Sequence, residues 1–179
     1  MNINVDDIFD FYELRISCHV TAVNYFASLL GYHFPEHDND KAKEPIRTGY
    51  AYIFYKNYHK NFHLLPGHVE LCGIARQTHL AHAPHHIPFY TDVSQIPDIR
   101  IYEMVSDWAS ANFEQKHIIK ETDSIPLEQW FNENMAQLPW SQNQLDIIKK
   151  SFAIIKEKTD SKYVKTIWQP LLEKVDLEV

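Results

Sequence analysis

Cysteine and glycine are both scarce in this chain, and each scarcity excludes a class of protein. The two cysteines, Cys18 and Cys72, lie far apart and form no CxxC pair. This excludes a disulfide scaffold and a thiolate zinc site, and it fits a reducing compartment. Only four glycines occur in 179 residues, which argues against a turn-dense all-β fold. We therefore expect an all-α protein.

The sequence also lacks a long apolar run and an excess of positive charge. No apolar stretch reaches the roughly 18 residues of a membrane span, and the acidic start MNINVDDIFDFYELR has no signal-peptide pattern. We therefore expect a cytoplasmic protein with no membrane partner. With 24 acidic and 17 basic residues the formal net charge is −7, so no stable nucleic-acid partner is expected.

The length of 179 residues predicts a single domain, because it suffices for one hydrophobic core but not for two. Within that domain we expect a metal-binding core over about 8–113 and C-terminal helices over about 124–179 that pack on it. The interval 113–123 is the expected joint between these parts. Aromatic-rich helices could provide a surface for a homo-oligomer.

Apolar spacing predicts the helices that carry the polar residues of interest. One helix is expected over about 8–30, ended by Gly31, with His19 in its middle. Further helices are expected over about 67–82 and 99–113, and the last helix is expected to be interrupted near Pro170. These helices would bring distant polar side chains to one interior.

Histidine is abundant and concentrated. Seven of the eleven histidines fall between His59 and His86, and others form an ordered set with aspartates. That set is His19, the doublet His37-Asp38, and Asp107. The doublet either opens a short helix or lies in the connection before one.

Each member of this set has an ordinary structural explanation when it is taken alone. A helix-borne histidine such as His19 is more often a hydrogen-bonded core residue, Asp38 could cap a helix, and Asp107 could pair with a buried arginine. Together, imidazoles and carboxylates from separated stretches are the ligands that suit a divalent transition metal. The ordered set therefore predicts a metal site made by His19, His37, Asp38 and Asp107.

The order H…HD…D resembles the signature of the HD-domain superfamily, which consists of all-helical metal-dependent phosphohydrolases. More closely, the runs His37-Asp-Asn-Asp-Lys41, His85-His86-Ile-Pro and Glu103-Met-Val-Ser-Asp107-Trp108 resemble an uncharacterised family of small HD-like proteins. The resemblance covers about residues 15–110. It implies an HD-like helical bundle and a divalent ion such as Mn, Fe, Co, Ni or Zn.

The resemblance also implies an activity, the hydrolysis of a phosphate ester or anhydride of a nucleotide or similar small molecule by metal-activated water. Lys41 or Arg76 would hold the substrate phosphate, and Glu44 would act as a base or orient the water.

The remaining histidines leave open whether there are one or two ions. Some HD-superfamily members hold two, with the aspartate of the doublet between them. His79 and either His85 or His86 are our candidate ligands for a second ion, with His82 or His68 in reserve. We assign His86 to the metal, and we take His82 and His85 as candidate substrate-binding residues. His79 and His82, three residues apart, are expected to share a helix face. His79 and His86 are only seven residues apart, whereas dinuclear members draw these ligands from separate helices, so both interpretations stay open.

Two other functions fit the same residues. A dinuclear-iron oxygenase, which a minority of the superfamily represents, would require the second metal. A non-catalytic scaffold would pack its histidines and bind no ion.

Overall fold

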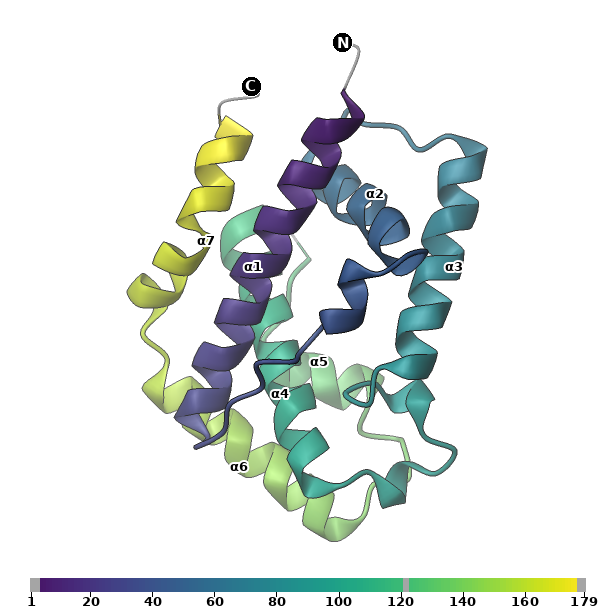
Figure 1. Ribbon diagram of the computed structural model, residues 1–179. Coiled ribbons are helices and arrows are strands. Elements are labelled where there is room, and N and C mark those ends of the chain that lie inside the picture. The colour runs from purple at the N-terminus through teal and green to yellow at the C-terminus, as the bar shows by residue number, and fades with distance from the viewer. Residues whose placement is uncertain (1–3, 121–122, 177–179) are drawn as a thin grey trace.

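The computed structural model describes residues 4–120 and 123–176, and all regular structure in these ranges is helical (Figure 1). The prediction of an all-α protein is confirmed. The α-helices are α1 (Val5–Leu29), α2 (Ile46–Tyr58), α3 (Pro66–His82), α4 (Asp98–Phe113), α5 (Leu127–Asn134), α6 (Gln142–Lys158) and α7 (Ser161–Asp176). Short 3-10 helices η1 (Asn39–Ala42), η2 (Ile87–Phe89) and η3 (Val93–Gln95) and a π-helix, η4 (Glu114–Ile119), complete the set.

Helix α1 begins and ends where local chemistry dictates. The Asn4 side chain accepts a hydrogen bond from the Asp6 backbone N–H, and the carboxylates of Asp6 and Asp7 face the positive end of the helix dipole. After Leu29 the chain reverses at Gly31, whose φ of 84° is in the left-handed region that favours glycine. The predicted stop at Gly31 is confirmed.

Helices α1 and α4 form the centre of the molecule. α1 packs against α2, α4 and α7, while α4 also packs against α6, and α2 packs against α3 (Figure 1). The core joins residues from the N-terminal and C-terminal helices, including Phe11, Phe26, Met104, Ile148 and Trp168, each at most 2% exposed. This packing sets α1 and α4, which carry His19 and Asp107, side by side in the interior.

A close approach at Gly49 sets the position of α3 relative to α2. A Cβ atom at Gly49 would lie 2.3 Å from the Ala75 Cβ and 2.5 Å from the Leu71 carbonyl oxygen. Only glycine allows this contact. Ala75 lies one turn before His79, so the contact holds the end of α3 near the centre of the bundle.

The C-terminal half differs from the sequence prediction in two places. Helix α7 continues through Pro170, where an interruption was predicted, and the fully buried Trp168 and Leu171 hold it against the core on either side of the proline. At the predicted joint over 113–123, the chain extends α4 as the π-helix η4, with Glu114 and Ile118 buried. Residues 121–122 of that joint lie outside the described residues.

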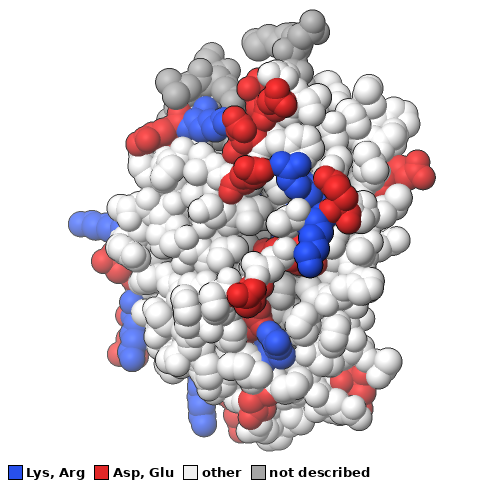
Figure 2. Space-filling view, in the orientation of Figure 1, with Lys and Arg blue, Asp and Glu red and all other residues white. Residues whose placement is uncertain are grey.

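The hydropathy of the helices and the distribution of surface charge agree with the composition of the chain. None of the helices in the described ranges has the length and apolar character needed to cross a membrane. On the face seen in Figure 2, acidic and basic side chains are interspersed and form no continuous basic stripe.

Candidate metal centre

Three side chains from three separate segments form a first group of ligand atoms. The group consists of His19 from α1, His37 from the segment before η1, and Asp107 from α4. The Asp107 Oδ1 atom lies 3.1 Å from the His19 Nε2 and 3.7 Å from the His37 Nε2. Both histidines are buried, whereas the Asp107 side chain is 15% exposed. Two imidazoles and a carboxylate thus converge on one point.

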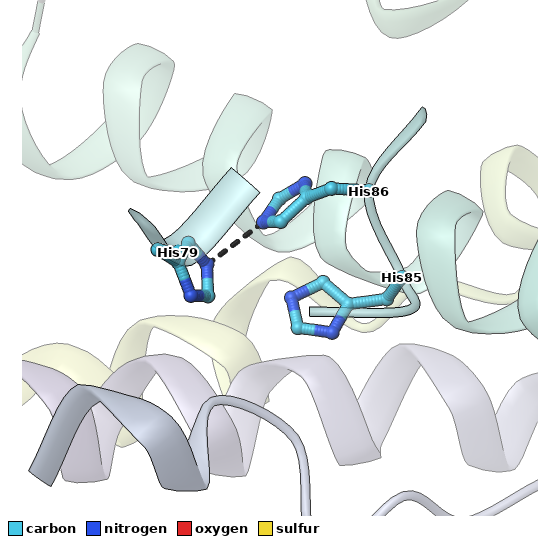
Figure 3. Close-up of side chains that lie close together, drawn as sticks. All are labelled: His79, His85 and His86. Carbon is cyan, nitrogen blue, oxygen red and sulfur yellow. Dashed lines mark hydrogen bonds between the residues drawn. The ribbon is translucent and has the colours of Figure 1, made fainter. Parts of the chain in front are cut away.

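Three histidines form a second group beside the first. His79 lies in the last turn of α3, and His85 and His86 lie in the loop that follows (Figure 3). The Nε2 atoms of His79 and His86 are 2.8 Å apart, and one nitrogen from each of the three rings lies within 4.8 Å of the others. Pro84 fixes the backbone just before the two adjacent histidines, which directs the loop back to the helix end.

The Asp38 carboxylate lies between the two groups. Its Oδ2 atom is 3.5 Å from the His19 Nε2 and 3.7 Å from the His37 Nε2. Its Oδ1 atom is 3.4 Å from both the His79 Nε2 and the His85 Nε2. Each oxygen therefore faces a different group, which is the arrangement of a carboxylate able to bridge two ions. A third set, His37, Asp38 and His85, straddles the two groups.

Asp38 reaches this position through a special backbone conformation. Its φ is 63° and its ψ is 14°, in the left-handed region that aspartate tolerates better than most residues. It is the residue before η1, and its side chain is 1% exposed. The doublet His37-Asp38 thus opens a short helix, which is one of the two placements predicted from the sequence.

Several candidate ligand atoms have no hydrogen-bond partner in the described structure. The buried atoms His37 Nε2, Asp38 Oδ1 and His85 Nε2 make no hydrogen bond, although His85 Nε2 and Asp38 Oδ1 approach each other. A buried polar atom without a partner costs about 1–3 kcal/mol. A cation at this position would satisfy all three atoms, so the side chains present fit a metal ion.

The outward nitrogens of two of these rings meet one carboxylate. The Glu103 Oε1 atom lies 3.1 Å from the His37 Nδ1 and 3.5 Å from the His85 Nδ1. Its other oxygen accepts a hydrogen bond from Arg100, one turn earlier on α4. An imidazole that donates from Nδ1 presents the lone pair of Nε2 to a metal.

Two of the other three rings, those of His79 and His19, also have partners at their Nδ1 atoms. The His79 Nδ1 lies 2.7 Å from the Asp40 Oδ2, and the His19 Nδ1 lies 3.1 Å from the Ser110 Oγ. Together with Glu103, these partners turn four Nε2 atoms toward the centre. Outer contacts of this type typically accompany metal-binding histidines.

Burial and charge act in opposite directions on the titration of the cluster. Burial disfavours the charged carboxylate of Asp38, but the nearby Lys41 and His37 outweigh it and hold its pKa well below the usual value. Burial also disfavours the His37 cation, but Asp38, Asp107 and Glu103 raise the pKa of that imidazole to about 10. Burial alone dominates at His86 and lowers its pKa to about 3. The carboxylates therefore stay ionised, as metal ligands must, whereas a metal ion would have to displace the proton from the His37 Nε2 on binding.

Lys41 is the buried cation of the site. Its Nζ donates a hydrogen bond of 2.7 Å to the Asp38 Oδ2, the oxygen that faces the first group. The ammonium also lies 4.7 Å from the centre of the Tyr50 ring, a favourable cation–π geometry. Lys41 is thus held beside the first group by a carboxylate and an aromatic face.

The structure brings together all six residues that the sequence assigned to metal binding. His19, His37, Asp38, His79, His86 and Asp107 all contribute atoms to the cluster. Lys41 adjoins it. His85, assigned to substrate but also considered in place of His86 as a ligand of a second ion, places its Nε2 among the candidate metal ligands.

Three other assigned residues lie on the exposed surface. Glu44 accepts a hydrogen bond from the Thr48 backbone N–H, Arg76 is exposed on α3, and His82 turns its Nδ1 to the Thr78 carbonyl oxygen. The expected shared face of His79 and His82 is not found, because the first is fully buried and the second is exposed. The face of α3 that packs on the bundle includes His79 but not His82.

The sequence reasoning missed the residues that orient the rings. Glu103 and Ser110 lie four residues before and three residues after Asp107, which places all three on one face of α4. That spacing is a signal that could have found them. Asp40 lies two residues after Asp38 in the acidic segment, where nothing in the sequence distinguishes it from its neighbours.

Comparison with known proteins places the chain in a family without assigning it an activity. No curated protein and no solved structure is similar enough to this chain to count as a match. A family model does match, over residues 9–161, and that range includes every residue of the cluster described above. The chain therefore belongs to the family of unknown function DUF5662.

Proposed function

We propose that this protein is a hydrolase of phosphate esters or anhydrides that uses two divalent metal ions. The observation that carries the proposal is the position of Asp38, whose two carboxylate oxygens face two different groups of ligand atoms. The first group offers two imidazoles and a carboxylate, and the second offers three imidazoles. Two-metal sites of this kind recur in phosphatases and nucleases.

When bound, such ions polarise a phosphoryl oxygen and lower the pKa of a bound water, which supplies a nucleophile near neutral pH. The chain itself supplies the orientation of the ligands. Its imidazoles are fixed through their Nδ1 atoms, so the site is preorganised and little rearrangement is needed on binding. Catalysis of phosphoryl transfer depends largely on such positioning and on electrostatic stabilisation.

Lys41 is our candidate for the residue that holds the substrate phosphate. Its ammonium is buried beside Asp38 and is fixed against the Tyr50 ring, so it presents a positive charge next to the first group. A lysine ammonium binds phosphate as a point charge. Glu44 and Arg76, which lie on the exposed surface, are not part of this proposal.

The proposed substrate is small. The formal charge of −7 disfavours a polynucleotide, and the cluster lies among mostly buried side chains, with Asp107, Asp40 and His86 as its partly exposed members. These features support a nucleotide or a similar phosphorylated small molecule.

A second candidate function is an iron-dependent oxygenase. The specific observation in its favour is that the first group consists of two histidines and one aspartate, a combination typical of non-haem iron oxygenases. The second group adds only nitrogen ligands, which also suit iron.

The experiment combines metal analysis with activity. The protein is purified from metal-replete medium, its metals are measured by mass spectrometry, and phosphate release is screened over nucleotides and sugar phosphates with and without oxygen. We expect close to two equivalents of metal and oxygen-independent phosphate release. Bound iron with turnover only in oxygen would instead support the oxygenase, and less than one equivalent with no gain on adding metal would contradict both.

A pair of variants tests the role of Asp38. Asp38→Asn keeps the size of the side chain but removes its charge, so we expect loss of both metal and activity. Asp10→Asn is the matched control, because Asp10 lies on α1 with its side chain 71% exposed. The control should keep wild-type metal content, and full activity in Asp38→Asn would overturn the proposal.

A further inference from the structure

One carboxylate touches a ligand from each of the two groups. Glu103 is 3% exposed, and its Oε1 atom lies 3.1 Å from the Nδ1 of His37 in the first group and 3.5 Å from the Nδ1 of His85 in the second. The two imidazole rings lie side by side, with their centres 4.2 Å apart. We propose that Glu103 is a positioning residue on which the binding of both ions depends. This inference rests on the proposed two-metal function.

The argument starts from the tautomer of each ring. A neutral imidazole has one N–H, and a proton on Nδ1 leaves the Nε2 lone pair of the same ring for a metal. Glu103 favours that tautomer in both rings, because its Oε1 atom is hydrogen-bonded to the His37 Nδ1 and lies 3.5 Å from the His85 Nδ1. The Nε2 atoms of His37 and His85 are the two ring nitrogens of the cluster that are buried and lack a hydrogen-bond partner. Glu103 therefore fixes the direction of both rings from the side opposite the ions.

Arg100 holds Glu103 in turn. Its guanidinium donates to the Oε2 atom of Glu103, while Oε1 remains for the two imidazoles. Arg100 lies three residues earlier on α4, and its side chain is 37% exposed. A buried carboxylate needs such a partner to remain charged and oriented. The Arg100–Glu103 pair therefore extends from the exposed side of α4 to a histidine of each group.

The other orienting residues act on one group each. Ser110 contacts the ring of His19, which belongs to the first group. Asp40 contacts the ring of His79, which belongs to the second. Among the described contacts to the outward nitrogens of these rings, Glu103 alone serves both groups. Glu103 is therefore a positioning residue shared by the two groups, whereas Ser110 and Asp40 each act on a single group.

The experiment measures Co²⁺ binding in two single-site backgrounds. His86→Ala leaves the first group complete, and Asp107→Ala leaves the second group complete. Glu103→Gln is then added to each background, and Co²⁺ is titrated while the visible absorption of the bound ion is recorded. Because a neutral amide accepts more weakly than a carboxylate, we expect about 10–100-fold weaker binding in both backgrounds, with a changed absorption band. Ser110→Ala, the control, should weaken binding only in the His86→Ala background.

The outcomes distinguish this inference from the proposed function. If the wild-type protein binds no Co²⁺, the proposed function itself fails. If the wild type binds two ions but Glu103→Gln weakens binding in one background or in neither, the inference about Glu103 is overturned and the two-metal function stands. If Glu103→Gln does not fold, Arg100→Met replaces it, because Arg100 can be changed without opening the core. That variant should also weaken Co²⁺ binding in both backgrounds, and an effect on one or on neither overturns the inference.

Discussion

The Nε2 atoms of His79 and His86 face each other at a distance of 2.8 Å. Burial lowers the pKa of both imidazoles, so both rings are neutral near pH 7. His79 can donate from Nδ1 to Asp40, which leaves its Nε2 as an acceptor. Without a metal, the two Nε2 atoms share one proton, whereas a cation between them would be met by two lone pairs.

This geometry predicts the effect of removing one of the two rings. His86→Ala should reduce the bound metal from two equivalents to one, because the second group loses a ligand while the first group stays complete. Metal content by mass spectrometry checks it. His82→Ala is the matched control, since that histidine is exposed and its Nδ1 contacts the Thr78 carbonyl oxygen of its own helix rather than the cluster. Equal metal content in the two variants would show that His86 is not a ligand.

Metal removal should destabilise the protein. Charged and unpaired groups are buried around Asp38, and an ion that binds only the folded state adds about 2.7 kcal/mol when its concentration is 100 times Kd. We expect Tm to fall by several degrees on treatment with a chelator and to recover when Mn²⁺ or Zn²⁺ is restored. Differential scanning calorimetry measures the change. In Asp38→Asn the Tm should not respond to added metal, and a response equal to that of the wild type would exclude a role for this carboxylate.

The contact between α2 and α3 gives a prediction about stability alone. Gly49→Ala should lower the free energy of unfolding by about 1–3 kcal/mol, because its Cβ would lie 2.5 Å from the Leu71 carbonyl oxygen. Gly73→Ala, on α3, meets no atom within 4 Å and should raise stability by about 0.5–1 kcal/mol. Urea unfolding of both variants measures the difference. A change of the same sign in both would contradict the close approach at Gly49.

The helices that carry the site could be predicted because their apolar spacing is regular. Helix α1 with His19 and helix α4 with Asp107 were both expected close to their observed bounds. Periodicity identifies the buried face of a helix, and a polar residue on that face is conspicuous. The order of the histidines and aspartates then predicted which of them converge.

The presence of His85 in the cluster together with His86, and the role of Glu103, could not be predicted in this way. His85 lies in a loop, where no period relates a residue to the face it presents, so its position among the ligands depends on the fold of the chain around Pro84. The role of Glu103 comes from its contacts with the rings of His37 and His85. These rings come from separate segments, and only the tertiary structure brings them to one carboxylate oxygen. The continuation of α7 through Pro170 depends in the same way on the packing of Trp168.

The buried ion pair of Arg15 on α1 and Glu114 at the start of η4 gives a last prediction, which concerns the stability of the contact between these two helices. Arg15 donates from Nε to the Glu114 Oε1 at 3.0 Å, and the Tyr58 hydroxyl donates to the same oxygen at 2.8 Å. Glu114→Ala would leave a buried guanidinium without its carboxylate, and it should cost about 3–5 kcal/mol of unfolding free energy in urea. Glu13→Ala removes a surface pair with Arg47 in which the glutamate side chain is 63% exposed, and it should cost less than about 1 kcal/mol. Similar losses in the two variants would mean that the buried pair contributes no more than a surface one, because burial is the main difference between them.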